Sequence, residues 1–136
     1  MRVVLDSNIL LGALLSPHTP PHTIHQAWRH GRFALVTCAI QLEELRRASR
    51  YPKFRTIPQP HRVGQMLNNL QGAILLDRLP DGDEAADPHD AWLLALTDTA
   101  RADYLVTGDK RWGIPARGHV KAARILTAAA FCRTVL

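Results

Sequence analysis

The chain has 136 residues, 46% of them apolar, and its 17 lysines and arginines outnumber 12 acidic residues, for a net charge of +5. This length suits one domain, which we expect to span residues 1–136. The composition excludes a disordered chain, and no run approaches the roughly 18 apolar residues of a membrane span. Because the chain starts a strand without a signal-peptide pattern, we expect a cytoplasmic protein without a membrane partner.

Strand-like and helix-like segments alternate along the whole chain. Short apolar runs predict strands at residues 2–5, 33–37, 73–76, 104–107 and 123–126. Helical spacing of apolar residues predicts helices at residues 8–15, 19–31, 42–51, 63–70, 87–96 and 127–131. Strands that alternate with helices imply βαβ units, so we predict an α/β fold with a parallel sheet.

The two cysteines, Cys38 and Cys132, lack the spacing of metal ligands and lie in apolar segments. We therefore expect buried free thiols rather than a disulfide.

Acidic residues stand one at a time beside the predicted strands and helices. Asp6 directly follows the strand at residues 2–5, and Asp109 follows Gly108 after residues 104–107, while Glu44 and Asp90 lie near helix starts. The carboxyl ends of parallel strands form one edge of a sheet, where ligands bind. Carboxylates about 5 Å apart repel by roughly 3 kcal/mol per pair at a dielectric near 20. Such a group needs protonation or a hard divalent cation, so the pattern indicates metal chemistry.

Each of these residues also has a structural explanation. Asp6 could cap the following helix, and Asn8 could form a turn or orient Asp6. Asp90, third in its helix, could complement the helix dipole. Glu44 could be an exposed helical acid, and Asp109 could be a turn residue. No one position decides between structure and chemistry; the combination favours a site.

Basic residues crowd one segment, and acidic residues crowd another. The basic segment contains Arg46, Arg47, Arg50, Lys53 and Arg55, and the acidic one covers residues 77–90. A basic flank beside an acidic site suits a polyanion whose phosphates approach a bound metal. Two solvated faces of opposite charge explain the same pattern.

Three stretches repeat the arrangement of an acid after a strand or within a helix. They are Val3-Val4-Leu5-Asp6-Ser7-Asn8; Glu44-Leu45-Arg46 with Tyr51-Pro52-Lys53-Phe54; and Asp87-Pro88-His89-Asp90 with the segment Ala102 to Asp109. Together they resemble the PIN-domain family, and within it the toxin components of bacterial toxin–antitoxin systems related to VapC-type toxins. The resemblance covers nearly the whole chain.

This resemblance implies a three-layer α/β/α fold around a mostly parallel sheet of four to five strands. It also implies a Mg²⁺- or Mn²⁺-dependent ribonuclease, a cognate antitoxin and a homodimer. The implied catalytic and metal-binding residues are Asp6, Glu44, Asp90 and Asp109, with Asn8 and Thr107 supporting the pocket and Arg46, Arg47, Arg50 and Lys53 binding RNA. The chain departs from the branch around the third acid, at His89, Ala91 and Trp92, and two residues past the fourth, at Arg111; both departures weaken the case for a second metal ion.

The implied reaction is endonucleolytic cleavage of RNA phosphodiester bonds by a metal-activated water. A non-catalytic RNA- or partner-binding module is the alternative, and the presence of all four acids argues against it. A phosphotransfer protein is a third interpretation. Its support is weak, because Asp6-Ser7-Asn8 lacks the second aspartate of a phosphohydrolase string and Lys110 alone favours it.

Overall fold

The computed structural model describes residues 1–48, 50, 60–76, 88–108, 119–120 and 122–136. Its strands are β1 (Arg2–Leu5), β2 (Ala34–Cys38), β3 (Ile74–Leu76), β4 (Tyr104–Val106), β5 (His119–Val120) and β6 (Ala123–Leu126). Its helices are α1 (Ser7–Leu15), α2 (Pro20–Arg29), α3 (Ala39–Ala48), α5 (Pro60–Asn69), α6 (Pro88–Thr99) and α8 (Ala128–Thr134), with a 3₁₀ turn at Leu70–Gly72. The five predicted strands and six predicted helices are all present, with ends shifted by a few residues.

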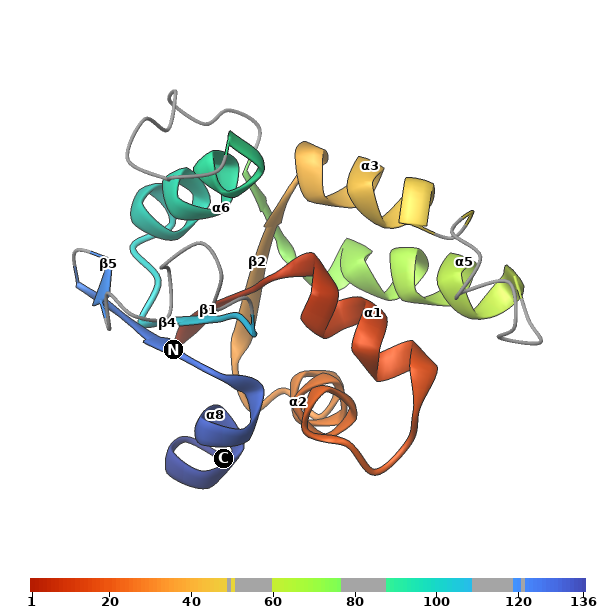
Figure 1. The fold of residues 1–136 in the computed structure, drawn as a ribbon, viewed down its shortest axis with the longest axis horizontal. Coiled ribbons are helices and arrows are strands. Elements are labelled where there is room, and N and C mark those ends of the chain that lie inside the picture. Colours follow the sequence, from red (N-terminus) through yellow and green to blue (C-terminus); the bar gives the residue numbers. More distant parts are fainter. Residues whose placement is uncertain (49, 51–59, 77–87, 109–118, 121) are drawn as a thin grey trace.

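The strands form one sheet in the order β3-β2-β1-β4-β6-β5, with β1 near the centre (Figure 1). Five strands are parallel, and β5 alone runs antiparallel, against β6. The predicted α/β fold with a mostly parallel sheet is therefore confirmed. The sheet has one strand more than the four to five expected, because β5 has only two residues and is too short to show a period.

Side chains alternate between the two faces of the sheet, as the pleat of a strand requires. Val3 and Leu5 of β1 pack into the larger apolar cluster with residues of α1, α2, α3, α5 and α8. Val4, between them, packs with residues of α6 on the opposite face. Figure 1 shows α6 on one side of the sheet and α1, α2 and α8 on the other. The result is the three-layer α/β/α arrangement.

Capping residues define the ends of two helices. The Thr19 hydroxyl accepts a hydrogen bond from the His22 backbone N–H at 3.4 Å, and Pro20 occupies the first position of α2. Gly31, with φ +77°, ends that helix in a conformation that side chains disfavour. The Thr127 hydroxyl caps α8 by accepting from the Ala130 N–H at 3.1 Å.

Both cysteines are free thiols, as predicted: Cys38 is buried and Cys132 is half-buried. Within the described segments, no helix is long and apolar enough to cross a membrane.

Candidate active site

Asp6 lies at the carboxyl ends of the two central strands. Leu5 of β1 is in register with Val106 of β4, and the next backbone contact is the Asp6 N–H donating to the Val106 carbonyl at 2.9 Å. The residue after Val106 is Thr107, whose Oγ1 donates to Asp6 Oδ2 at 2.8 Å. Asp6 is only 8% exposed and Thr107 is fully buried. The sheet register thus brings together two residues that are 101 positions apart in the sequence.

The Asp6 carboxylate has a structural role as well. Its Oδ1 accepts a long hydrogen bond, 3.5 Å, from the backbone N–H of Asn8, and Asp6 is the N-cap of α1. The contact comes from the Asn8 backbone, and the residue itself is exposed. Both sequence interpretations of Asp6 therefore apply: it caps a helix, and it stands buried at the strand edge.

A buried side-chain amide supports the backbone at the carboxyl end of β1. Gln41 of α3 is fully buried; its Nε2 donates to the Leu5 carbonyl at 2.7 Å and approaches Ser7 Oγ at 3.4 Å. Its Oε1 accepts from Thr37 Oγ1 at 2.6 Å. These bonds tie β1, β2, α1 and α3 together around the residue before Asp6. Sequence reasoning missed Gln41, because a lone glutamine in a helix is usually exposed.

Glu44 lies one helical turn after Gln41, on the same side of α3. Glu44 is half-buried, whereas Glu43 is exposed. Burial raises the pKa of the Cys38 thiol at the carboxyl end of β2, and the charge of Glu44 adds to this rise. Since Val36 is in register with Val4, Cys38 is level with Asp6. Glu44 therefore lies toward the same edge as Asp6.

The other two predicted acids are less completely described. Asp90 is in the first turn of α6, which begins at Pro88, and its side chain lies outside the described part of the structure. Asp109 comes directly after the last described residue beyond β4, so its prediction falls outside the described residues. Among the residues that are described, no group of three or more His, Cys, Asp or Glu side chains could hold a metal ion.

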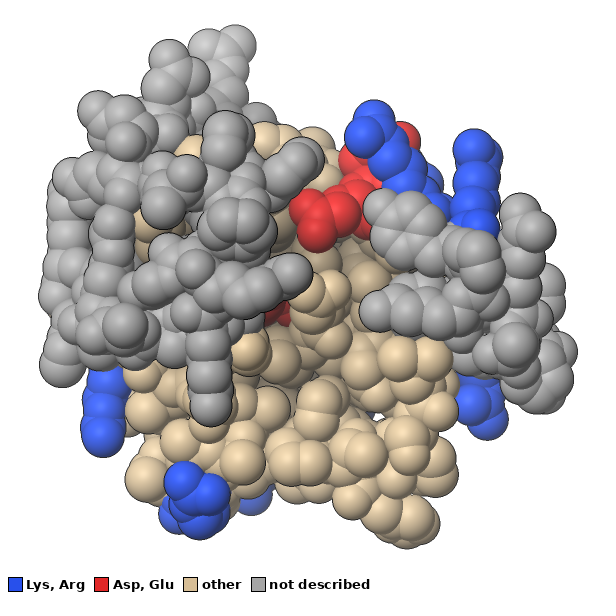
Figure 2. All heavy atoms as spheres, viewed as in Figure 1, with Lys and Arg blue, Asp and Glu red and all other residues tan. Residues whose placement is uncertain are grey.

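The predicted RNA-binding arginines lie on the last turn of α3 and just beyond it. Arg46 and Arg47 are exposed and pair with Glu43 at 3.6 Å and 3.7 Å. Figure 2 shows acidic and basic side chains side by side over α3. Exposed pairs of this kind contribute at most about 1 kcal/mol, so both guanidinium groups can exchange Glu43 for another anion. Arg50 is exposed after the helix, and Lys53 falls outside the described residues.

Comparison with known protein families gives a match that agrees with this fold. A family model for the PIN domain matches residues 2–111, a range that contains all four predicted acids. No curated protein matches the chain. Proteins with this domain are generally nucleases that need a divalent metal ion. Because the match covers well over half of the 136 residues, the chain belongs to the PIN-domain family.

Proposed function

We propose that the protein is a divalent-metal-dependent endoribonuclease whose active site is the carboxyl edge of β1 and β4. The observation that carries the proposal is the buried Asp6 carboxylate, fixed by the Thr107 hydroxyl at 2.8 Å where two central parallel strands end. Ligands of parallel α/β sheets bind at such edges. Membership of the PIN-domain family supports the nuclease assignment.

The residues at this edge fit a hard divalent cation. Asp6 offers carboxylate oxygen, the donor that Mg²⁺ prefers, and Thr107 fixes its orientation through Oδ2. Glu44 offers a second carboxylate, and the sequence adds those of Asp90 and Asp109. Mg²⁺ retains several waters when it binds protein, so a few carboxylates suffice. We assign Asp6, Glu44, Asp90 and Asp109 as its ligands, directly or through water, with Mg²⁺ or Mn²⁺ as the ion.

Each residue then has a distinct task. A bound Mg²⁺ would lower the pKa of the attacking water and neutralise charge on the scissile phosphate. Thr107 holds the Asp6 carboxylate in one orientation, and Gln41 holds the backbone before it. Glu44 positions the attacking water. Single-stranded or looped RNA is the expected substrate, because its backbone is accessible.

The basic residues near α3 supply affinity for the RNA backbone. We assign Arg46, Arg47, Arg50 and Lys53 to phosphate contacts, which make binding dependent on salt concentration. Arg46 and Arg47 must release Glu43 to do so. Glu43 therefore weakens non-specific binding at this position.

The test is cleavage of a pool of structured and unstructured RNAs by the wild type and by Asp6→Asn, with Mg²⁺, Mn²⁺ or EDTA. We expect cuts that need the metal ion and a loss of at least about a hundredfold in Asp6→Asn, the scale of removing one preorganised electrostatic group. The matched control is Asp103→Asn. Asp103 is exposed, precedes β4 at the opposite end of the sheet and accepts from the Arg2 N–H at 2.8 Å. It should cut like the wild type.

Full activity of Asp6→Asn with Mg²⁺ would contradict the assignment. RNA binding without divalent ions and without any product, by folded wild type, would favour the alternative, a non-catalytic RNA- or partner-binding module.

A toxin role in a toxin–antitoxin pair is also part of the proposal, and it rests on the resemblance to VapC-type toxins. We propose that the protein acts in the cytoplasm as a homodimer and that a small antitoxin neutralises it. Growth arrest on expression of the wild type, absent with Asp6→Asn, would support the toxin role. Unimpaired growth despite confirmed RNA cleavage by the purified protein would refute the toxin role and leave the nuclease intact.

A further inference from the structure

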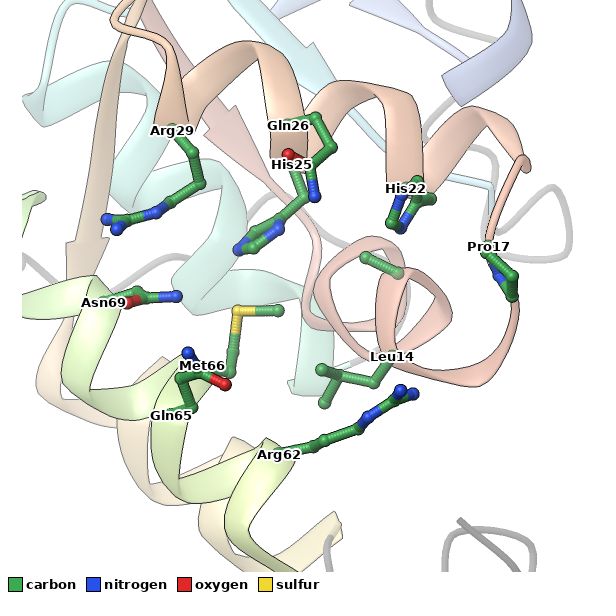
Figure 3. Close-up of a pocket in the computed structure, with 11 residues that line it drawn as sticks. Leu14, Pro17, His22, His25, Gln26, Arg29, Arg62, Gln65, Met66 and Asn69 are labelled. Atoms are coloured by element: carbon green, nitrogen blue, oxygen red, sulfur yellow. The ribbon is translucent and has the colours of Figure 1, made fainter. Parts of the chain in front are cut away.

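A second polar site lies at the other end of α1 from Asp6. It is a pocket of about 350 Å³ between α2 and α5, with the last turns of α1 against it (Figure 3). We call it the α2–α5 pocket; its polar lining residues are His22, His25, Gln26, Arg29, Arg62, Gln65 and Asn69. Leu14, which also lines it, is eight residues from Asp6, or roughly 12 Å along the helix axis.

The polar lining of the α2–α5 pocket consists of cationic, imidazole and amide groups. No acidic residue is among its described lining residues, and no described carboxylate pairs with Arg29 or Arg62. The two arginines come from different helices, Arg29 from α2 and Arg62 from α5, and Figure 3 shows them on opposite sides of the pocket. Two cations that line one pocket without a described counter-ion create a positive potential that attracts an anion.

His25 is the unsatisfied group in this pocket. Its Nε2 is buried and has no hydrogen-bond partner among the described residues. The ring points into the pocket, toward the side of Met66 and Asn69 (Figure 3). It packs edge-on against Trp28, with ring centroids 5.7 Å apart, and Arg29 lies over the same indole at 5.8 Å. Buried polar atoms in proteins are normally hydrogen-bonded, so an unsatisfied one near the Arg29 cation points to a ligand.

We propose that the α2–α5 pocket binds a phosphoryl group, supplied either by an RNA backbone or by a free phosphate compound. A phosphate monoester presents three terminal oxygens and up to two charges, and a backbone phosphodiester presents two non-bridging oxygens and one charge. Either group can accept hydrogen bonds from Arg29 and from an amide of the same lining such as Asn69, and Arg62 on the opposite side adds to the positive potential. The apolar part, which includes Leu14 and Met66, leaves room for a sugar or base attached to the phosphate.

The pKa of His25 can be used to detect anion binding in this pocket. Burial, then the charge of Arg29 and of His22, lowers the pKa of His25, so that the ring is neutral near pH 7. Arg62 faces it from α5, and the α1 residues at the pocket, Ala13 and Leu14, are uncharged. An anion bound beside the ring would favour the imidazolium and raise this pKa. Phosphate binding should therefore shift the titration of His25 to higher pH.

The experiment follows the His25 ring by NMR while inorganic phosphate is added at constant ionic strength, with chloride as the replaced anion. We expect a saturable shift of the ring signals and a rise in the His25 pKa. Arg29→Gln and Arg62→Gln should each weaken binding about tenfold, because each removes a positive charge from the pocket lining. The matched control is Arg32→Gln, an exposed arginine just after α2 that does not line the pocket. It should bind phosphate like the wild type.

A short single-stranded RNA without a terminal phosphate identifies the source of the group. If RNA and phosphate both shift His25 and compete, the backbone is a source; if phosphate alone acts, the ligand is a free phosphate compound. The proposal is overturned if neither shifts His25, if Arg32→Gln weakens binding as much as Arg29→Gln, or if an acidic peptide binds there and phosphate does not. These results are independent of the nuclease, because Asp6→Asn should still bind phosphate in this pocket.

Discussion

The two ends of α1 differ in how their polar groups are satisfied. At the N-terminal end, Asp6, Thr107 and Gln41 are buried and linked by hydrogen bonds. At the C-terminal end, the α2–α5 pocket has Arg29 without a described acidic partner and a buried His25 nitrogen without a described hydrogen-bond partner. The first region is negative and rigidly supported, and the second is positive and incompletely paired.

This difference shows two ways in which a small domain prepares a binding site. A carboxylate that must hold a cation gains from being fixed in advance, because its orientation then costs nothing at the moment of binding. Cations that receive an anion gain from having no internal partner, because nothing must be displaced. In this protein, one nine-residue helix connects both kinds of site.

The largest expected effect is a loss of stability when Gln41, which supports the strand end beside Asp6, is truncated. Gln41→Ala leaves the Leu5 carbonyl and the Thr37 hydroxyl without their partner and opens a cavity. We expect unfolding to become easier by about 2–4 kcal/mol, as for other buried polar truncations and cavities. Urea denaturation measures this. Gln26→Ala, the same change at an exposed position of α2, should alter stability little; equal losses in both variants would show that the Gln41 network is not what stabilises this end.

A smaller effect, on catalytic activity, is expected when the hydrogen bond from Thr107 to Asp6 is removed. Thr107→Val keeps the shape of the side chain and removes the hydroxyl that donates to Asp6 Oδ2. We expect kcat/KM for RNA cleavage to fall about tenfold, because a hydrogen bond to a charged group is lost in the site.

Thr97→Val is the control for Thr107→Val. Thr97 is also buried, but its hydroxyl donates to the Leu93 carbonyl within α6 at 2.8 Å. Both variants should lose a similar amount of stability, about 1 kcal/mol, and only Thr107→Val should lose activity. If the two enzymes cut equally well, the Thr107 hydroxyl does not position Asp6 for catalysis.

The smallest expected effect is on the pH dependence of stability, and it comes from His25 in the α2–α5 pocket. Because the pKa of His25 is lowered below 6.5 in the folded protein, the unfolded chain binds this proton more readily. The His25 contribution to stability is therefore fully present above pH 6.5 and is lost as the pH falls toward the folded pKa.

A melting series over pH, in buffers without phosphate, checks this contribution. The melting temperature of the wild type should fall more steeply on acidification below pH 6.5 than that of His25→Gln. Parallel curves would mean that His25 is not held in its neutral form.

Much of the fold follows from local patterns in the sequence. Thr19 with Pro20, Gly31 and Thr127 mark helix ends because capping depends on neighbours within three or four residues. The parallel sheet follows from the alternation of strands and helices. The antiparallel strand β5 was not predicted, since two residues contain no period and its pairing with β6 depends on a turn.

The candidate site also has some features that could be predicted from the sequence and others that depend on packing. The position of Asp6 at a strand end was readable from the sequence, and its contact with Thr107 follows once β1 and β4 are known to be neighbours. The burial of Gln41 was not readable, because it depends on how α3 packs over the end of β1. The α2–α5 pocket was missed for the same reason: His25 and Arg62 are 37 positions apart, and only the packing of α5 beside α2 joins them.

The most direct test of the contrast between the two ends of α1 is an NMR titration of labelled wild-type protein, with Mg²⁺ in one sample and phosphate in another. Mg²⁺ should shift the amide signals of Asp6, Asn8 and Thr107 at the strand edge, and phosphate should shift those of His25 and Arg29 in the pocket. If Mg²⁺ leaves the signals of Asp6 and Thr107 unchanged, or if phosphate without metal acts at that edge instead of the pocket, the two sites have been assigned to the wrong ends.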